Sequence, residues 1–460
     1  METKSLSRAE ASRLASETSN PRSGRGLDAE HGSGTADQEY LELRCVNPVA
    51  RERERGSSPL DASARIADDR AMKPILVAAS LAALICASPA RADFSSCVAS
   101  LRADAADKGV SQKTIAAAFD GLKADPKVIE LEGVQPEFKT PIWDYMAGLV
   151  DDERVADGKA AMAREAGALA KAEAHFGVDR HVLAAIWGVE SNFGEDMGQR
   201  PLVQSLATLA CMSEQRPGYF RGELMAALKI VDRGDIPLDK LTGSWAGAFG
   251  QTQFMPSTFL RLAVDLDGSG RDIVDSPAAA LASTANYLSH SGWRTGEPWG
   301  FEVKLPENYS GPSGRKAKAP MSTWASRGIK RIDGRPLGDG EAGLLLPAGA
   351  DGPAFLVTHN FDVIYSYNAA ESYTLAISIL AQRLAGGPGI VTPWPTDDPG
   401  LSRAGRREVQ ALLAKRGYDV GPPDGAIGAK TKSAIADFQG KNGLTVDGRA
   451  SVKVLEALRR

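Results

Sequence analysis

One carboxylate of this chain is predicted to lie on the apolar side of a helix, where a charge is costly. Within residues 182–194 (VLAAIWGVESNFG), Leu183, Ile186 and Glu190 are spaced i, i+3 and i+7 and therefore share one helical face. Because apolar surroundings disfavour the ionised form, we expect the Glu190 carboxyl to keep its proton and act as a general acid. The same spacing also fits a carboxylate that reaches solvent at the helix end or pairs with an arginine.

A second stretch supplies groups that can bind a polar ligand. Residues 243–256 (GSWAGAFGQTQFMP) combine glycines, amides and aromatic rings. These residue types let a backbone approach a ligand closely, form hydrogen bonds to it and stack on it. Small residues at this density are also typical of a tight helix crossing, so packing alone is the alternative.

The overall composition indicates an ordinary globular protein. The chain has 460 residues, a length that is enough for two or three domains. Its formal net charge is −4, and 43% of its residues are hydrophobic and 24% charged. No basic run is interleaved with aromatic residues, so we expect no nucleic-acid partner. The five histidines are too widely spaced for a zinc signature.

The first 92 residues resemble an export signal with an extension before it. Residues 1–71 are polar and aperiodic, as in a disordered arm or an over-extended reading frame. Met72-Lys73-Pro74 is then followed by an apolar run and by Ala90 and Ala92 in the spacing of a cleavage site, which predicts a signal peptide at 72–92. We therefore expect a periplasmic protein that begins near Asp93 and has no membrane span in its mature form.

Cysteine placement agrees with an oxidising compartment. Cys45 and Cys86 fall in the segments expected to be removed, which leaves Cys97 and Cys211. An even pair in an exported protein predicts a disulfide between them.

Helical spacing dominates the following residues. The helix that carries Glu190 is expected to be capped by Asp179 and ended by Gly194, after an alanine-rich helix from about residue 151 to 176. The aromatic-rich segment 135–145 is expected to be extended. These features place the first domain at residues 93–385.

The remaining segments predict a small strand-bearing part, a linker and a separate C-terminal unit. Strand-like patches occur at 301–305 and 354–357, and residues 386–400 are rich in Pro, Gly and Asp, as linkers are. Residues 401–460 are expected to form three helices around two similar Asp-Gly turns. Those helices are predicted at 403–415, 429–441 and 451–458.

Residues 265–270 (DLDGSG) are similar to the first half of an EF-hand calcium loop. The candidate ligands are Asp265, Asp267, Ser269 and Asp275, but Ser269 replaces a carboxylate and Asp275 falls one place short of the twelfth position. We therefore expect a helix-linking turn and no metal, with calcium as the alternative.

Four motifs make residues 93–385 resemble the family 3 lytic murein transglycosylases, the membrane-bound lytic transglycosylase B group of glycoside hydrolase family 103. They are GVESNFG at 188–194, SWAGAFGQTQFMPS at 244–257, STANYL at 283–288 and Tyr-Asn at 367–368. The C-terminal unit resembles the peptidoglycan-binding type 1 domain. This second resemblance is carried by residues 412–418, 424–425, 431–439 and 442–448.

The first resemblance implies a mainly α, lysozyme-like catalytic domain with a small strand-containing subdomain, and the second a three-helix peptidoglycan-binding domain. The resemblance to the transglycosylases implies that Glu190 is the sole catalytic acid and base. Five residues match substrate-binding positions of the family: Arg216, Tyr219, Ser244, Gln253 and Asn368. The family often has two adjacent arginines, but here Gln215 stands beside Arg216, so the first arginine has no counterpart.

The implied reaction cleaves the β-1,4 bond between N-acetylmuramic acid and N-acetylglucosamine and leaves 1,6-anhydromuramoyl ends, without a cofactor. A hydrolytic muramidase would need a second carboxylate, for which Glu195 and Asp196 are the nearest in sequence. A non-catalytic wall-binding protein is the other alternative. Peptidoglycan strands are the expected partner of a monomer, with proteins of cell-wall synthesis or hydrolysis as further candidates.

Overall fold

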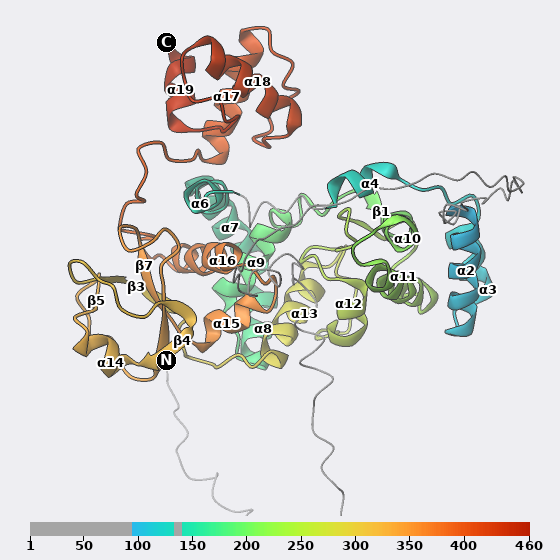
Figure 1. Cartoon of the computed structure of the whole chain (residues 1–460). Coiled ribbons are helices and arrows are strands. Elements are labelled where there is room, and N and C mark those ends of the chain that lie inside the picture. Colours follow the sequence, from blue (N-terminus) through green and yellow to red (C-terminus); the bar gives the residue numbers. More distant parts are fainter. Residues whose placement is uncertain (1–93, 133–139) are drawn as a thin grey trace, which may run out of the picture. The chain divides into compact units, whose positions relative to one another are not determined.

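The structure is a computed structural model that describes residues 94–132 and 140–460 (Figure 1). The predicted signal peptide (72–92) and the extension before it lie outside the described residues. Within the described part, no helix combines the length and the apolar character needed to cross a bilayer. The mainly helical fold class that the sequence predicts is confirmed.

Helices account for most of the described chain. They are α2 (Phe94–Asp107), α3 (Gln112–Phe119), α4 (Pro126–Leu131), α6 (Ile142–Leu149), α7 (Asp152–Arg164), α8 (Ala166–Phe176), α9 (Arg180–Ser191), α10 (Leu202–Met212), α11 (Pro217–Asp232), α12 (Pro256–Leu262), α13 (Pro277–His290), α14 (Met321–Ser326), α15 (His359–Tyr365), α16 (Glu371–Leu384), α17 (Arg403–Lys415), α18 (Ala429–Lys441) and α19 (Val452–Arg459). The strands are β1 (Arg200–Pro201), β2 (Thr242–Gly243), β3 (Gly300–Lys304), β4 (Gly314–Pro320), β5 (Lys330–Arg331), β6 (Glu341–Leu345) and β7 (Ala354–Val357).

Helix α9, which carries Glu190, is buried nearly all round. Every residue from 182 to 188 is buried, and α7, α8, α13 and α16 pack against the helix (Figure 1). The Asp179 side chain accepts the N–H of the second helical residue and caps the first turn, as predicted. The last turn ends earlier than predicted, because Asn192 is the C-cap in the left-handed conformation (φ 50°). Asparagine tolerates this conformation, so the helix ends two residues before Gly194.

A five-stranded antiparallel sheet in the order β4-β6-β7-β3-β5 forms the small subdomain. β3 pairs with β7 over the two segments that the sequence predicts as strands. Phe301, Trp324 and Leu356 belong to a core of its own, and the Trp324 indole N–H donates to the Ala342 carbonyl at 2.8 Å. β4 and β6 were not predicted, because their sequences lack the β-branched and aromatic residues that are typical of strands.

The N-terminal helix is joined covalently to the main core. The predicted disulfide links Cys97 in α2 to Cys211 in α10, with Cα atoms 5.9 Å apart. Helix α10 in turn packs along α11. The first described helix is thereby fixed to the helices that follow the active-site region.

Two predicted elements are wrong. The alanine-rich helix expected from about residue 151 to 176 is interrupted at Glu165, where α7 ends and α8 begins. The described part of segment 135–145 is not extended after Pro141, since helix α6 begins at Ile142. Pro141 occupies the N-cap and is compatible with a helix start, where a backbone N–H is not needed. Aromatic residues there belong to a helix that packs on α16.

The C-terminal unit is a three-helix group of α17, α18 and α19 around its own apolar core. Its two Asp-Gly turns are each held by a buried glutamine. The Gln410 amide donates to Asp424 Oδ1 at 2.9 Å and accepts the Gly425 N–H at 2.7 Å. In the second turn the Gln439 amide donates to Asp447 Oδ1 at 2.7 Å and accepts the backbone N–H groups of Asp447 and Gly448. Each turn therefore gains both a donor and an acceptor from the core.

Candidate active site

Glu190 lies half-buried on the last turn of α9 and shares a short hydrogen bond with a tyrosine. The Tyr373 hydroxyl, from the first turn of α16, donates to Glu190 Oε1 at 2.5 Å. Tyr373 is only 2% exposed. Burial, and next the negative charge of Glu190, raise the pKa of Tyr373 well above 10, so its hydroxyl keeps the proton that it donates. A fixed donor of this kind orients the carboxyl and stabilises it after it has lost its proton.

A second buried tyrosine connects this region to the 243–256 segment. The Tyr367 hydroxyl donates to the Thr252 carbonyl at 2.7 Å. Its ring packs edge-on against Tyr287, with centroids 4.9 Å apart. Burial, followed by the charge of Glu190, raises the pKa of Tyr367 well above its ordinary value, so this hydroxyl also stays protonated near the carboxyl.

Segment 243–256 packs directly against the end of α9. The Ser191 hydroxyl donates to the Gln251 carbonyl at 2.5 Å and accepts the Gly194 N–H at 2.9 Å. Within the segment, Ser244 closes a tight turn: its N–H donates to the Ala248 carbonyl at 2.8 Å, and its Oγ accepts the Ala248 N–H at 3.1 Å. The Ser244 side chain is half-buried, and because its Oγ accepts the Ala248 N–H, its hydroxyl proton can be donated to a ligand.

Gln253 has a structural task in addition to the predicted one. It adopts φ 51°, and its amide donates to the Gly250 carbonyl at 2.8 Å and to the Met197 carbonyl at 3.0 Å. One proton of the amide therefore closes a turn within the segment, and the other holds the segment to the loop that follows α9. The amide oxygen is the atom through which Gln253 can accept a hydrogen bond from a ligand.

Asn368 is the predicted substrate-binding residue that lies between α15 and α16. It follows Tyr367 in the turn between α15 and α16, and its carbonyl accepts the Ala370 N–H at 2.7 Å. Its side chain is half-buried. Asn368 therefore stands in the chain between Tyr367 and Tyr373, whose pKa values are raised by burial and next by the charge of Glu190. Its role at the substrate stays a prediction.

Tyr219 and Arg216 lie at the start of α11, on the far end of segment 243–256. The Arg216 guanidinium stacks over the Tyr219 ring at 5.3 Å. One turn further along α11, buried Glu223 accepts the Ser257 N–H at 2.8 Å and its hydroxyl at 2.6 Å. Because Tyr219 and Glu223 share one helix face, Tyr219 lies near the point where the segment runs into α12. The described contacts do not join Tyr219 or Arg216 to Glu190.

The two carboxylates named as candidates for a hydrolytic muramidase are exposed to solvent. Glu195 and Asp196 are both exposed in the loop after α9. Glu195 accepts a hydrogen bond from the Asn192 amide at 2.6 Å. Their position gives no support to a second catalytic carboxylate from this loop.

Two of the candidate calcium ligands in the loop at 265–275 accept hydrogen bonds from backbone N–H groups of the same loop. Asp265 accepts the N–H groups of Asp267, Gly268 and Gly270, and Asp267 accepts the Ser269 N–H and hydroxyl. Asp275 forms an ion pair with Lys240 and does not face the loop ligands. Within the described ranges, no group of three His, Cys, Asp or Glu side chains is arranged to hold a metal ion.

Tyr373 is the residue that the sequence analysis missed. Its sequence signal is weak: it is the third residue of α16 and stands shortly after the Tyr-Asn motif at 367–368. Only the packing of α16 on α9 brings it to Glu190, across 183 residues of chain.

Comparisons with known proteins agree with this geometry. The model of the transglycosylase SLT domain family matches residues 93–382, and that of the peptidoglycan-binding domain matches 402–458. Membrane-bound lytic murein transglycosylase B of Escherichia coli is 33% identical over 247 residues, which are 52% of this chain and 66%, just under two thirds, of that protein.

Two solved structures extend the likeness. SltB3 from Pseudomonas aeruginosa, in complex with NAG-anhNAM-pentapeptide, is 44% identical with a TM-score of 0.64, over 80% of this chain and 100% of that chain. The Escherichia coli lytic transglycosylase Slt35 in complex with calcium is 29% identical with a TM-score of 0.56, over 63% and 92%. Since the matching family model covers more than half of the sequence, this chain belongs to the transglycosylase SLT domain family.

Proposed function

We propose that the chain is a lytic murein transglycosylase that uses Glu190 as its only acid and base. It cleaves the β-1,4 bond between N-acetylmuramic acid and N-acetylglucosamine and forms 1,6-anhydromuramoyl ends. The observation that carries this proposal is the half-buried Glu190 carboxyl with the permanently protonated Tyr373 hydroxyl donating to it at 2.5 Å. The relatives of known structure include SltB3 in complex with NAG-anhNAM-pentapeptide, a ligand that carries an anhydro sugar.

The reaction needs one carboxyl in two stages. Protonated Glu190 gives its proton to the glycosidic oxygen, and the C1–O bond breaks with its electron pair on that oxygen. The N-acetyl group of the substrate stabilises the positive charge left at C1, so that no second carboxylate is required. The Glu190 carboxylate then takes the proton of the C6 hydroxyl while O6 bonds to C1, which restores the acid and adds no water.

The chain's own residues hold these stages in place. Tyr373 fixes one oxygen of Glu190 and stabilises the carboxylate between the two proton transfers. Ser244 and Asn368, which match substrate-binding positions of the family, are the residues proposed to hold the N-acetyl or C6 groups, where correct orientation contributes to the rate. The C-terminal domain binds peptidoglycan and keeps the enzyme at the wall.

Location and metal use complete the proposal. The Cys97–Cys211 disulfide and a wall substrate support a periplasmic site of action, which cell fractionation tests. The chain works without a metal, because the carboxylates of loop 265–275 are already bonded to backbone N–H groups and to Lys240.

The deciding experiment is mass spectrometry of sacculi digested by wild-type enzyme and by Glu190→Gln. Wild type releases anhydro-ended fragments, and the variant loses at least about 100-fold in rate, as expected when a general acid is removed. Sacculus binding is unchanged in the variant, because the binding domain is untouched.

Glu195→Gln is the matched control, since it changes a nearby exposed carboxylate and retains activity. Reducing ends in the wild-type digest would favour a muramidase, and no release at all would favour a binding protein. Full activity in Glu190→Gln would refute the assignment of the acid.

A further inference from the structure

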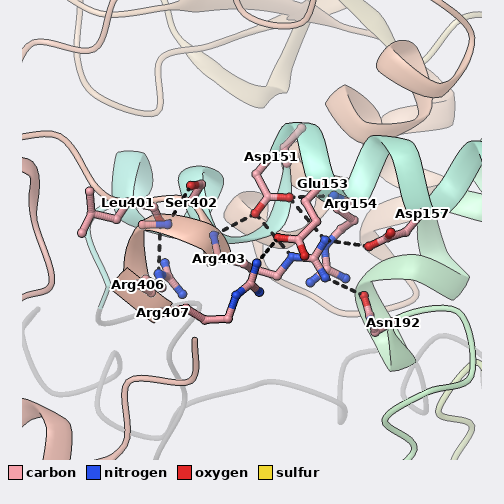
Figure 2. Close-up of polar contacts among 12 residues, drawn as sticks. Asp151, Glu153, Arg154, Asp157, Asn192, Leu401, Ser402, Arg403, Arg406 and Arg407 are labelled. Atoms are coloured by element: carbon pink, nitrogen blue, oxygen red, sulfur yellow. Dashed lines mark hydrogen bonds and ion pairs between the residues drawn. The ribbon is translucent and has the colours of Figure 1, made fainter. Parts of the chain in front are cut away.

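Two arginines at the start of α17, Arg403 and Arg407, pair with acidic residues at the start of α7 in the catalytic domain (Figure 2). The Arg403 guanidinium donates to Asp157 at 3.0 Å, and its backbone N–H donates to Asp151 Oδ2 at 2.8 Å. Arg407 pairs with Glu153 at 2.7 Å. The carboxylates lie in the first turns of α7, where the helix dipole favours them.

The arginines, by contrast, lie where the helix dipole opposes them. Arg403, Arg406 and Arg407 occupy the first two turns of α17, and positive charge at a helix N-terminus is unfavourable. Their positions are therefore explained by their partners across the interface and not by the stability of their own helix. A fourth arginine, Arg449, adds a two-pronged contact to Asp144 at 2.8 and 2.9 Å.

Arg403 also reaches the end of the catalytic helix. Its Nη1 donates to Asn192 Oδ1 at 2.9 Å, as Figure 2 shows. Asn192 is the left-handed C-cap of α9, and its N–H closes the last turn on the Gly188 carbonyl at 3.1 Å. That turn carries Glu190, two residues before Asn192.

The same turn is held from the catalytic side by a buried arginine. Arg154 of α7 donates to the Gly188 carbonyl, and its N–H is bonded to Asp151 Oδ1 at 2.7 Å. Burial, and next the positive charge of Arg403, lower the pKa of Arg154 to about 10. Asp151, with a side chain only 4% exposed, therefore joins an arginine from each domain to one helix end.

We propose that Arg403 is a positioning residue: the peptidoglycan-binding domain supplies, through its bond to Asn192, part of the scaffold that orients Glu190. The domain is then more than a wall anchor, because its docking contributes to catalysis on substrates too short to occupy it. This inference rests on Glu190 being the acid and base.

The test measures kcat and KM on a short soluble glycan, the tetrasaccharide of alternating N-acetylglucosamine and N-acetylmuramic acid, with full-length variants. Arg403→Ala lowers kcat about 10-fold, in line with the sensitivity of rate to small misplacements, and changes KM less than about 2-fold. Arg407→Ala, which removes an ion pair of the same interface without touching Asn192, leaves kcat within about 2-fold of wild type.

Two further variants separate positioning from stability. Arg403→Lys keeps a positive charge beside Asp151 and Asp157 but lacks the planar fork, so we expect a near-normal melting temperature and a lowered kcat. Asn192→Gly keeps the left-handed C-cap while removing the amide, and it lowers kcat as Arg403→Ala does. The double variant Arg403→Ala/Asn192→Gly shows no additional loss of kcat, because the hydrogen bond between Arg403 and Asn192 is the one contact that both changes remove.

Several results would overturn the proposal. They are equal kcat values for Arg403→Ala and Arg407→Ala, full activity of Arg403→Lys, or additive losses in the double variant. An active Glu190→Gln enzyme would instead refute the proposed function, so the two failures are distinguishable.

Discussion

The hydrogen bond between Tyr373 and Glu190 makes the sharpest prediction about catalysis. Tyr373→Phe removes the hydroxyl that donates to Glu190 Oε1 at 2.5 Å and leaves the buried ring in place. Without that donor, the carboxylate formed by the first proton transfer loses a charge-assisted hydrogen bond and the carboxyl loses its orientation. Proton transfer to the glycosidic oxygen therefore becomes less favourable, and kcat falls.

The magnitude follows from the exposure of the acid. A hydrogen bond to a charged group contributes about 1.5–3 kcal/mol. Glu190 is half-buried, so partial access of water favours the lower end of that range. At about 1.4 kcal/mol for each factor of ten, the expected loss in kcat is about 10-fold.

The assay is the initial rate of anhydro-fragment release from a soluble glycan, together with thermal unfolding of each variant. Tyr287→Phe is the matched control, because Tyr287 is also buried and its hydroxyl donates to the Ser366 carbonyl at 2.5 Å. Both variants lose one buried hydrogen bond, worth about 1 kcal/mol of stability. Unchanged kcat in Tyr373→Phe, or an equal loss in Tyr287→Phe, would refute the role of Tyr373.

Two further predictions concern pH and metal removal. Burial raises the pKa of Asp151, but the N–H donors of Arg154 and Arg403 and the charge of Arg403 outweigh this effect, so the pKa lies below 3.8. Ionised Asp151 therefore stabilises the folded state fully above pH 3.8, and this stabilisation is lost as the pH falls through the folded-state pKa. The difference in unfolding free energy between wild type and Asp151→Asn, measured by urea unfolding, should be constant from about pH 6 to 5 and shrink below about pH 4; a constant difference to pH 3 would contradict this. A chelator should leave the melting temperature and the rate unchanged, because Asp265 and Asp267 are bonded within their own loop, and a rise of either on adding calcium would contradict it.

The identity of the catalytic helix was predictable because its signals are local. Asp179 caps it, and an unbroken run of apolar residues from 182 to 188 makes it a buried element. The argument from one apolar face was less accurate, since the helix is buried on all sides and Glu190 is partly exposed only because it lies in the last turn. The C-cap at Asn192 was missed because a later glycine gave the stronger signal.

The environment of the acid was not predictable from spacing. Tyr373 approaches Glu190 only because α16 packs on α9, and no local pattern marks a tyrosine for that role. Gln253 was expected at the substrate, yet both of its amide protons hold backbone carbonyls, one of them in the loop after α9. These assignments depend on tertiary packing, which overrides the chemistry suggested by residue type alone.

The end of α9 receives contacts from three distant parts of the chain. Tyr373 is 183 residues from Glu190, the Gln251 carbonyl is 60 residues from Ser191, and Arg403 is 211 residues from Asn192. A lone helical turn frays readily, because its last carbonyls lack partners within the helix. The turn that carries Glu190 is therefore bonded to α16, to the 243–256 segment and to the C-terminal domain. Under our proposals each of these three contacts helps to orient the carboxyl, so the loss of any one of them should lower kcat while the helix itself remains folded.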